Sequence, residues 1–263
     1  MLPKRLQKYL QIPSATADKY SRGVVGFVTG SDVYPGAAIL GVTAAIRTGI
    51  GMVRFSGPEA VEKMLLESRP EVVCEPGRVS AWVLGSGLTR DDASRLHEAL
   101  TSEEPKIIDA GALEICDFET LRGISILSPH AGEAAKLISR LDSPIDRSVI
   151  EADPELAARR LSQITGQTVC LKGNITVIAS PDLETVSVGP NPSDLATAGT
   201  GDVLAGIMGA ILAANSQDFD PLDVAQTAVL IHSEAARRLS LTGPIAALDL
   251  ADEVRTVVAE WRS

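Results

Sequence analysis

The chain has 263 residues, of which 45% are hydrophobic and 22% charged, with a formal net charge of −10. This composition suits a globular protein with a full core, and its acidity excludes a broad basic surface for nucleic acid. No run of about 18 apolar residues predicts a membrane span and no signal-peptide-like segment opens the chain, so we expect a cytoplasmic protein.

Short apolar runs alternate with helix-like stretches, which is typical of a mostly parallel sheet covered by helices on both faces. The predicted strands are 24–29, 51–55, 81–84, 106–109, 123–127, 168–171, 174–180 and 184–188. The predicted helices are 36–48, 58–67, 91–100, 131–140, 155–165, 202–214, 221–240 and 246–261.

Other segments refine this prediction. The polar, proline-containing stretch 143–154 predicts an irregular surface loop. The last three strands are joined only by short turns, which indicates an antiparallel edge on the sheet. No linker-like stretch divides the chain, so we predict a single α/β domain, with residues 1–17 as an N-terminal extension or helix. The widely spaced cysteines favour neither a disulfide framework nor a zinc site.

The glycine-rich turn Gly199-Thr200-Gly201-Asp202 precedes an apolar helix. Its glycines allow close approach of a ligand, and the free N–H groups and dipole of a helix N-terminus attract phosphate. Asp202 is placed where a carboxylate could take a proton from a bound hydroxyl. The simpler alternative is that Asp202 is only an N-cap, since aspartate is a preferred residue there.

A second candidate is the turn from Lys172 to Thr176, where one predicted strand ends in Lys-Gly and the next begins. Lys172 and Thr176 could reach phosphate or ribose oxygens, although the spacing is not that of a P-loop. The alternative is a plain hairpin with a surface lysine.

His130 follows a predicted strand, at the position where open α/β sheets bind ligands. His97 and His232 lie within predicted helices and are expected to be structural. The small-residue loops 30–38, 85–88 and 109–113 also follow predicted strands. Parallel strands would bring these loops together along one crevice of a size to hold a nucleotide-like ligand.

Taken in order, these segments resemble the ADP-dependent NAD(P)H-hydrate dehydratases, a branch of the ribokinase-like superfamily. The matching segments are 19–23, 34–38, 47–54, 128–133, 172–176, 196–206 and 243–247. The resemblance implies a ribokinase-like three-layer sandwich, with a mostly parallel central sheet, helices on both faces and an antiparallel edge.

The resemblance also implies a carbon–oxygen lyase that repairs a damaged metabolite. Such an enzyme restores NADH or NADPH from the S-form of the hydrated cofactor (NADHX or NADPHX), using ADP and releasing AMP and phosphate. The ring hydroxyl is first phosphorylated, and phosphate then leaves by elimination. Magnesium would bridge the phosphates, with no protein ligand assigned. A separate epimerase would interconvert the two hydrate forms, and the expected assembly is a homotetramer.

The residues implied by the resemblance fall into three groups. Those expected to bind the adenine nucleotide are Lys172, Gly173, Asn174, Ile175, Thr176 and Gly201. Those expected to bind the hydrated cofactor are Ala38, Gly87, His130 and Asp202, with Asp202 as the catalytic base. Those expected to form an anion hole for the transferring phosphoryl group are Gly199, Thr200 and Gly201.

Three segments depart from the family pattern. Asp18-Lys19 stands where a His-Lys pair is common before the first strand. Ser86 stands where a proline often lies between two glycines, and we expect it to loosen that turn. The segment 189–194 is also unusual and precedes the glycine turn.

Two other functions remain open from the sequence. A small-molecule kinase of the same superfamily, such as a vitamin-precursor kinase, would use the same turn but keep the phosphate on its product. Segments 34–38 and 47–54 favour the dehydratase over this kinase. A non-catalytic nucleotide-binding module would bind nucleotide without turnover, and the presence of Asp202 with both turn glycines argues against it.

Overall fold

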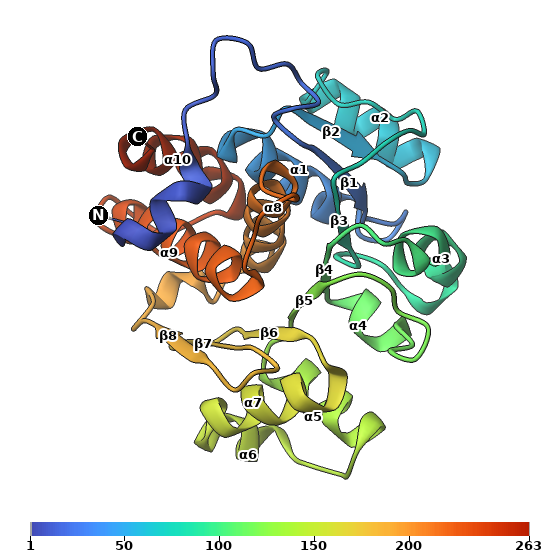
Figure 1. Cartoon of the computed structure of the whole chain (residues 1–263), viewed down its shortest axis with the longest axis vertical. Helices are drawn as coiled ribbons and strands as arrows, with labels where there is room; N and C mark the ends of the chain where they lie inside the picture. Colours follow the sequence, from blue (N-terminus) through green and yellow to red (C-terminus); the bar gives the residue numbers. More distant parts are fainter. Residues whose placement is uncertain (1, 263) are drawn as a thin grey trace.

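A computed structural model describes residues 2–262 and contains one eight-stranded sheet, in the order β2-β1-β3-β4-β5-β6-β7-β8 (Figure 1). The strands are β1 (Val24–Val28), β2 (Met52–Phe55), β3 (Ala81–Leu84), β4 (Lys106–Asp109), β5 (Ser125–Ser128), β6 (Thr168–Leu171), β7 (Thr176–Ala179) and β8 (Thr185–Val188). Neighbouring strands pair in parallel from β2 through β6, and β7 is antiparallel to both β6 and β8. The predicted antiparallel edge is therefore confirmed.

Helices cover both faces of this sheet because successive strand residues point to opposite sides. Phe27 and Ile107 belong to one buried apolar cluster, whereas Val28 and Ile108 belong to another. The first cluster also contains residues of α1 (Pro35–Thr48), α2 (Glu59–Ser68), α8 (Thr200–Ala214), α9 (Pro221–Ser240) and α10 (Ala247–Trp261). The second contains residues of α3 (Ala93–Thr101), α4 (Gly111–Ile115), α5 (Ala131–Leu141), α6 (Arg147–Ala152) and α7 (Pro154–Thr165). The expected three-layer sandwich is confirmed.

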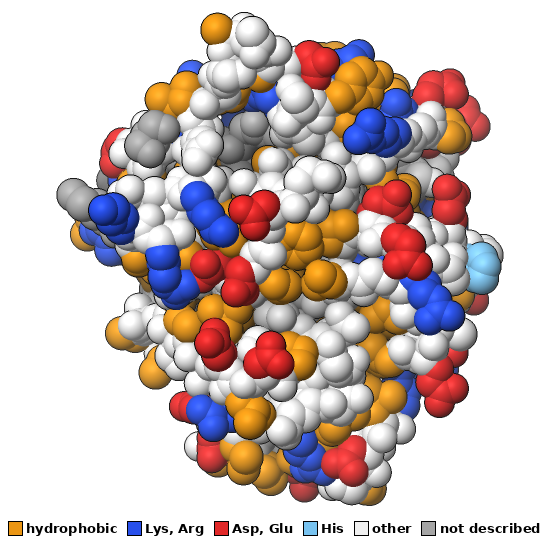
Figure 2. All heavy atoms as spheres, in the orientation of Figure 1, with side chains coloured by type: hydrophobic (Ala, Val, Ile, Leu, Met, Phe, Trp, Pro, Cys, Tyr) orange, Lys and Arg blue, Asp and Glu red, His pale blue; other side chains and the backbone are white. Residues whose placement is uncertain are grey.

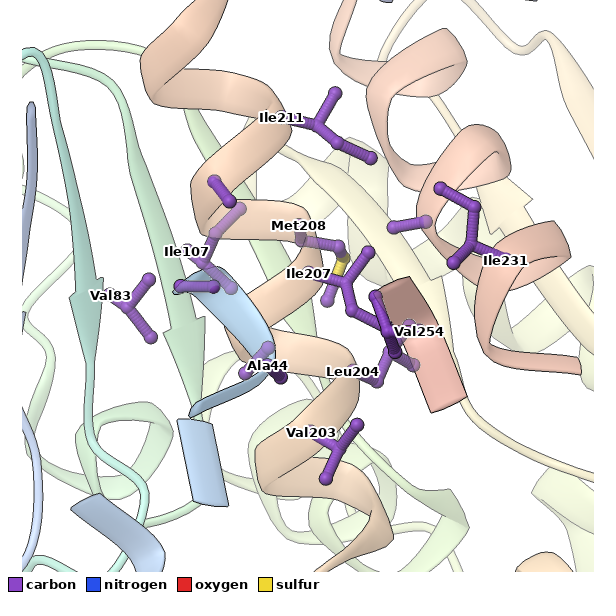
Figure 3. Close-up of a cluster of buried hydrophobic side chains, with 14 of the residues drawn as sticks. Ala44, Val83, Ile107, Val203, Leu204, Ile207, Met208, Ile211, Ile231 and Val254 are labelled. Atoms are coloured by element: carbon purple, nitrogen blue, oxygen red, sulfur yellow. The ribbon is translucent and has the colours of Figure 1, made fainter. Parts of the chain in front are cut away.

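Helix α8 lies at the centre of the first layer, and most of its residues are buried. In Figure 3 its side chains lie between Val83 and Ile107 of the strands and Ile231 and Val254 of α9 and α10. A helix that is apolar on all sides is typical of such a buried position. This packing fixes the place of the N-terminus of α8, where the predicted phosphate turn lies.

Close crossing of α1 and α8 depends on Gly206. A Cβ built on Gly206 would lie 2.1 Å from the carbonyl oxygen of Gly41 in α1. We expect Gly206→Ala to lower the free energy of unfolding by about 1–3 kcal/mol, because overpacking forces the two helices apart. Urea unfolding measures this, with Gly243→Ala as control, since a Cβ there meets no atom within 4 Å. Equal stability of the two variants would contradict the tight crossing.

Two segments differ from the sequence prediction. The stretch 143–154 is not irregular throughout, because it contains the short helix α6, whose Ile150 is fully buried against the second layer. The segment 109–113, expected as a turn, leads into the short helix α4, where Leu113 is buried. In both cases burial of apolar side chains among neighbouring elements, Ala112 and Leu113 in α4 and Ile150 in α6, stabilises a helix too short to be predicted from local pattern. At the N-terminus, the 3-10 helix Lys4–Leu10 packs near α9 and α10.

None of the described helices has the length and apolarity needed to cross a membrane. On the face drawn in Figure 2, basic side chains alternate with acidic ones rather than gathering in one patch. Cys74, Cys116 and Cys170 form no disulfide within residues 2–262. Cys170 is fully buried, as expected for a small core residue, and burial raises the pKa of its thiol to about 12.

Candidate active site

The candidate site lies at the carboxyl edge of the parallel strands. The chain leaves β1 toward β2 on one side and returns to β3 on the other, and this change of direction is where open α/β sheets bind ligands. The two loops that follow β1 and β3 are joined there. The N–H of Gly30 donates to the carbonyl of Ser86 at 2.7 Å, and the hydroxyl of Ser31 donates to that of Gly87 at 2.8 Å. The predicted convergence of these loops is confirmed.

Gly87 and the start of α1 meet closely on the side predicted to bind the hydrate. Gly87 has a φ of +71°, and a Cβ there would lie 2.7 Å from that of Ala37 and 2.9 Å from the carbonyl oxygen of Tyr34. A larger residue would separate the two loops. Ala38 is fully buried as a whole residue, so a ligand would meet its neighbours rather than Ala38 itself. Hydrate binding by Ala38 and Gly87 stays a prediction.

A buried polar network runs along this edge from β3 to β6. The hydroxyl of Ser86 donates to Oδ2 of Asp109 at 3.0 Å, and Nζ of Lys172 lies 2.5 Å from Oδ1 of Asp109. The Asp109 side chain is 2% exposed and that of Lys172 is 19% exposed. Ser86 therefore does not loosen its turn, because its buried hydroxyl ties that turn to Asp109. Lys172 is not a free surface lysine either, although β6 and β7 do form the expected hairpin.

Burial alone would lower the pKa of the Lys172 ammonium, but the carboxylates of Asp109 and Glu133 outweigh that effect and raise it. Lys172 thus stays positively charged beside the predicted phosphate turn. A Cβ built on Gly201 would lie 3.6 Å from Nζ of Lys172, so the end of β6 and the start of α8 are neighbours. The fold brings these two predicted nucleotide-binding residues together.

The N-terminus of α8 has the features of an anion site. Its N-cap is Gly199, with a φ of +91° and no capping side chain. The N–H of Thr200 donates to the carbonyl oxygen of Thr197 at 3.4 Å, and the N–H of Val203 donates to that of Gly199 at 3.2 Å. Within residues 2–262, the intervening N–H groups of Gly201 and Asp202 have no backbone acceptor, as is usual in a first helical turn.

The side chains of this turn have separate roles. The hydroxyl of Thr200 lies 2.8 Å from the carbonyl oxygen of Leu195 and 2.9 Å from that of Thr197, so it holds the preceding loop. Asp202 is the third helical residue, and Gly199 occupies the cap position. The alternative that Asp202 is only an N-cap is therefore wrong, and the helix begins two residues earlier than predicted.

Electrostatics distinguish Asp202 from an ordinary surface carboxylate. Burial and the neighbouring charge of Asp109 raise the pKa of Asp202 to about 6, while the nearby Ser86 hydroxyl and the charge of Lys172 oppose the rise. The single hydroxyl proton of Ser86 is directed to Asp109, so its support of Asp202 is weaker. A carboxylate with this pKa is partly protonated in mild acid and basic enough to accept a proton near neutral pH.

The phosphoryl transfer that the sequence resemblance implies should therefore have an acidic limit set by Asp202. We expect kcat at saturating ADP to fall as pH drops below about 6, approaching tenfold per pH unit, because only the deprotonated carboxylate accepts a proton. The terminal phosphate of a nucleotide titrates in a similar range. Calorimetric titration of ADP binding across the same pH range is the control. A flat kcat between about pH 5 and 8 would contradict a titrating base.

Hydrogen bonds from Asn191 hold the predicted nucleotide turn in place. The sequence analysis noted Asn191 only as part of the unusual segment 189–194. The Asn191 side-chain amide donates to the carbonyl of Gly173 at 3.0 Å and to Oγ1 of Thr176 at 3.2 Å. Its backbone N–H donates to the carbonyl of Asn174 at 2.7 Å. Thr176 is 4% exposed, whereas Gly173, Asn174 and Ile175 are exposed at the tip. Their contact with a nucleotide stays a prediction.

His130 has a structural role at the start of α5. It is the N-cap of α5, and its Nδ1 accepts from the N–H groups of Gly132 at 3.0 Å and Glu133 at 3.2 Å. This places the ring proton on Nε2, and the side chain remains 58% exposed at the carboxyl edge. Glu133 also lines a pocket of about 360 Å³ beside His130, with Arg90, Leu113, Glu114, Lys136, Leu137 and Arg140.

Within the part of the chain that the structure describes, no cluster of three His, Cys, Asp or Glu side chains could hold a metal alone. A magnesium ion that bridges phosphates takes most ligands from phosphate and water and needs only one or two carboxylates. Asp109 and Asp202 are close enough for the charge of one to raise the pKa of the other. Both oxygens of Asp109 are already held by Ser86 and Lys172, so a phosphate-bound magnesium ion would depend on phosphate, water and the nearby Asp202.

Asp109 is the functional residue that sequence reasoning missed. It lies in the last position of β4, inside a loop segment already singled out. The available signal was a carboxylate at the carboxyl end of a parallel strand. Its partners, Ser86 and Lys172, are far away in the sequence, so only the strand order reveals the network.

Comparison with known proteins identifies the family. A family model described as NAD(P)H-hydrate dehydratase matches residues 25–255. The ADP-dependent (S)-NAD(P)H-hydrate dehydratase of Neisseria meningitidis is 34% identical over 282 residues, covering 97% of this chain and 92% of that protein. The ADP/ATP-dependent NAD(P)H-hydrate dehydratase from Bacillus subtilis, co-crystallised with ATP/Mg²⁺, superposes with a TM-score of 0.86 at 26% identity, covering 98% of this chain and 97% of that one.

A bifunctional NAD(P)H-hydrate repair enzyme of Mycobacterium tuberculosis is 41% identical over 214 residues. That match covers 77% of this chain but 43% of the relative, and the chain spans less than half the length of several such bifunctional proteins. The expected ribokinase-like fold is confirmed by the solved structures. The family match across most of the chain, with the similarity to the Neisseria protein over nearly the full length of both, shows that this chain belongs to the NAD(P)H-hydrate dehydratase family.

Proposed function

We propose that this chain converts the S-form of NADHX or NADPHX back to NADH or NADPH, with consumption of ADP and release of AMP and phosphate. The observation that carries the proposal is Asp202, a carboxylate with a raised pKa in the first turn of α8, beside free N–H groups and the Lys172–Asp109 pair. The names of the Neisseria and Bacillus relatives support the hydrate and nucleotide as substrates.

In the first step the hydroxyl oxygen of the hydrated ring attacks the terminal phosphorus of ADP. Asp202 takes the hydroxyl proton as the new O–P bond forms, and AMP leaves with the electrons of the broken P–O bond. The N–H groups of Gly201 and Asp202, with the Lys172 ammonium, stabilise the negative charge of the transferring group.

In the second step the ring C–O bond breaks, and phosphate leaves with the electron pair. The proton on the adjacent ring carbon passes to solvent water, and the electron pair of that C–H bond forms the double bond that restores the dihydronicotinamide. Phosphate is a far better leaving group than hydroxide, which is the chemical reason for consuming ADP. His130 lies on the edge where the rest of the hydrated cofactor would bind.

Magnesium bound to the phosphates would neutralise their charge and orient the terminal phosphoryl group, held mainly by phosphate and water with Asp202 nearby. The Mg²⁺ in the Bacillus co-crystal supports this requirement. The free cysteines support a reducing, cytoplasmic location. A separate epimerase partner and a homotetramer stay predictions.

The deciding experiment follows dihydronicotinamide absorbance in a hydrated cofactor mixture after addition of ADP or, in parallel, ATP. Recovery with production of AMP and phosphate from ADP is expected. No recovery with either nucleotide contradicts the dehydratase. A phosphorylated product that accumulates without dihydronicotinamide would favour the vitamin-precursor kinase, and nucleotide binding without any product would favour a non-catalytic module.

A further inference from the structure

The two walls of the proposed phosphoryl-transfer site come from separate parts of the chain, and both rest on α9. One wall is the turn Lys172–Thr176 between β6 and β7, and the other is the turn Gly199–Asp202 at the start of α8. Helix α9 packs against α8, β6 and β7. Two consecutive residues of α9, His232 and Ser233, each make a hydrogen bond toward one of these walls.

His232 holds the anion-hole wall. Its Nε2 lies 2.9 Å from the carbonyl oxygen of Thr200, which can only accept, so the ring proton is on Nε2. The side chain is 6% exposed, and burial lowers the pKa of His232 to about 4, so the ring is neutral near pH 7. This neutral donor fixes the first residue of α8 without adding charge next to a phosphate.

Ser233 holds the nucleotide wall through Asn191. Its hydroxyl donates to Oδ1 of Asn191 at 2.6 Å. With Oδ1 occupied, the amide nitrogen of Asn191 is directed toward Gly173 and Thr176, to which it donates. Asn174 completes the link, since its side-chain amide donates to the carbonyl of Asn191 at 3.0 Å.

We propose that His232 and Ser233 are positioning residues that together set the separation between the nucleotide turn and the anion hole. This inference rests on the proposed function, since it assigns ADP to the turn Lys172–Thr176. Because the two residues are adjacent on one helix, their hydrogen bonds are kept in fixed register. The donor phosphate on one wall then faces the base and amides on the other. Phosphoryl transfer is sensitive to such placement, and a misplacement of about 1 Å can cost about 10²-fold in rate.

The nucleotide half is tested with Ser233→Ala. We expect its Kd and KM for ADP to rise about 3–10-fold, the size of one hydrogen bond, while KM for the hydrate stays within about twofold. Ser233→Thr keeps a hydroxyl and should restore most of the ADP affinity. The matched control is Ser240→Ala on the same helix, because the Ser240 hydroxyl has no hydrogen-bond partner among residues 2–262. That control should leave both constants unchanged.

The path through Asn191 is tested by a double-mutant cycle of Ser233→Ala and Asn191→Ala on ADP binding. We expect the double variant to lose less affinity than the sum of the two single losses, since both changes break the same link. Fully additive losses would show that Ser233 acts by another route.

The anion-hole half is tested with His232→Leu, which fills the space but removes the donor, and His232→Gln, which can place an amide N–H near the Nε2 position. We expect kcat to fall about tenfold or more in the leucine variant, with a smaller change in ADP affinity and partial recovery in the glutamine variant. Thermal unfolding of every variant checks the fold.

The outcomes separate this inference from the proposed function. A loss of thermal stability with no selective change in ADP affinity or kcat would reduce both residues to structural ones and overturn the inference. If the wild type binds ADP but repairs no hydrate, the proposed function fails, and the calorimetric Kd series for ADP still decides the role of Ser233. If the wild type does not bind ADP, both the proposed function and this inference fail.

Discussion

Asp202→Asn is expected to lower turnover of the hydrate about 10²–10⁴-fold, the usual cost of losing a general base, while ADP still binds. Asparagine keeps the size of the side chain and leaves the N–H groups of Gly201 and residue 202 in place, so the anion site survives. Steady-state assays give the loss of kcat, and calorimetry gives the Kd for ADP.

The matched control for this substitution is Asp249→Asn. Asp249 is the third residue of α10, as Asp202 is of α8, but it is exposed. Asp249→Asn therefore removes the same favourable charge from a first helical turn without changing the candidate site. Near wild-type activity is expected in the control. Equal turnover in Asp202→Asn and Asp249→Asn would show that Asp202 contributes only to the helix.

The same substitution should stabilise the protein near neutral pH. The folded-state pKa of Asp202 is raised from its ordinary 3.8 to about 6, so folding penalises its charged form. This penalty is small near pH 4, grows as pH rises through about 6, and is then roughly 3 kcal/mol at most. Asp202→Asn should thus exceed the wild type in stability at pH 7–8 and match it near pH 4, as urea unfolding at each pH can show.

Lys172→Met is expected to lower the free energy of unfolding by about 3–5 kcal/mol, because it leaves the buried charge of Asp109 without its partner. The Ser86 hydroxyl alone cannot replace the ammonium. We also expect ADP binding to be lost or strongly weakened, since the cation beside Gly201 disappears. Urea unfolding and calorimetry measure the two effects.

The control is Lys136→Met, which breaks the exposed pair with Glu114. The Lys136 side chain is 71% exposed, and such pairs contribute at most about 1 kcal/mol. A comparable loss of stability in both variants would show that the Lys172–Asp109 pair is energetically ordinary. Any residual activity of Lys172→Met should have its acidic limit above pH 6, because the ammonium helps to lower the pKa of Asp202.

Local pattern was sufficient to predict most elements of this fold. The predicted strand 106–109 and the predicted helix 221–240 have the same bounds as the observed elements, because each combines a clear apolar pattern with a clear boundary. The errors concern short elements. Helices α4 and α6 exist because Leu113 and Ile150 are buried against neighbouring helices, which no local pattern records.

The sequence by itself determined the fold class, the family resemblance and the main candidate residues. Glycines, a first-turn carboxylate and a Lys-Gly turn are local features, so Gly199–Asp202 and Lys172–Thr176 could be recognised without coordinates. Only the tertiary structure decided that Asp202 is not a cap, that Ser86 and Lys172 meet on Asp109, and that α9 holds both walls. The reason is physical: parallel strands join residues far apart in sequence at one edge, and burial there sets which charges pair and which pKa values shift.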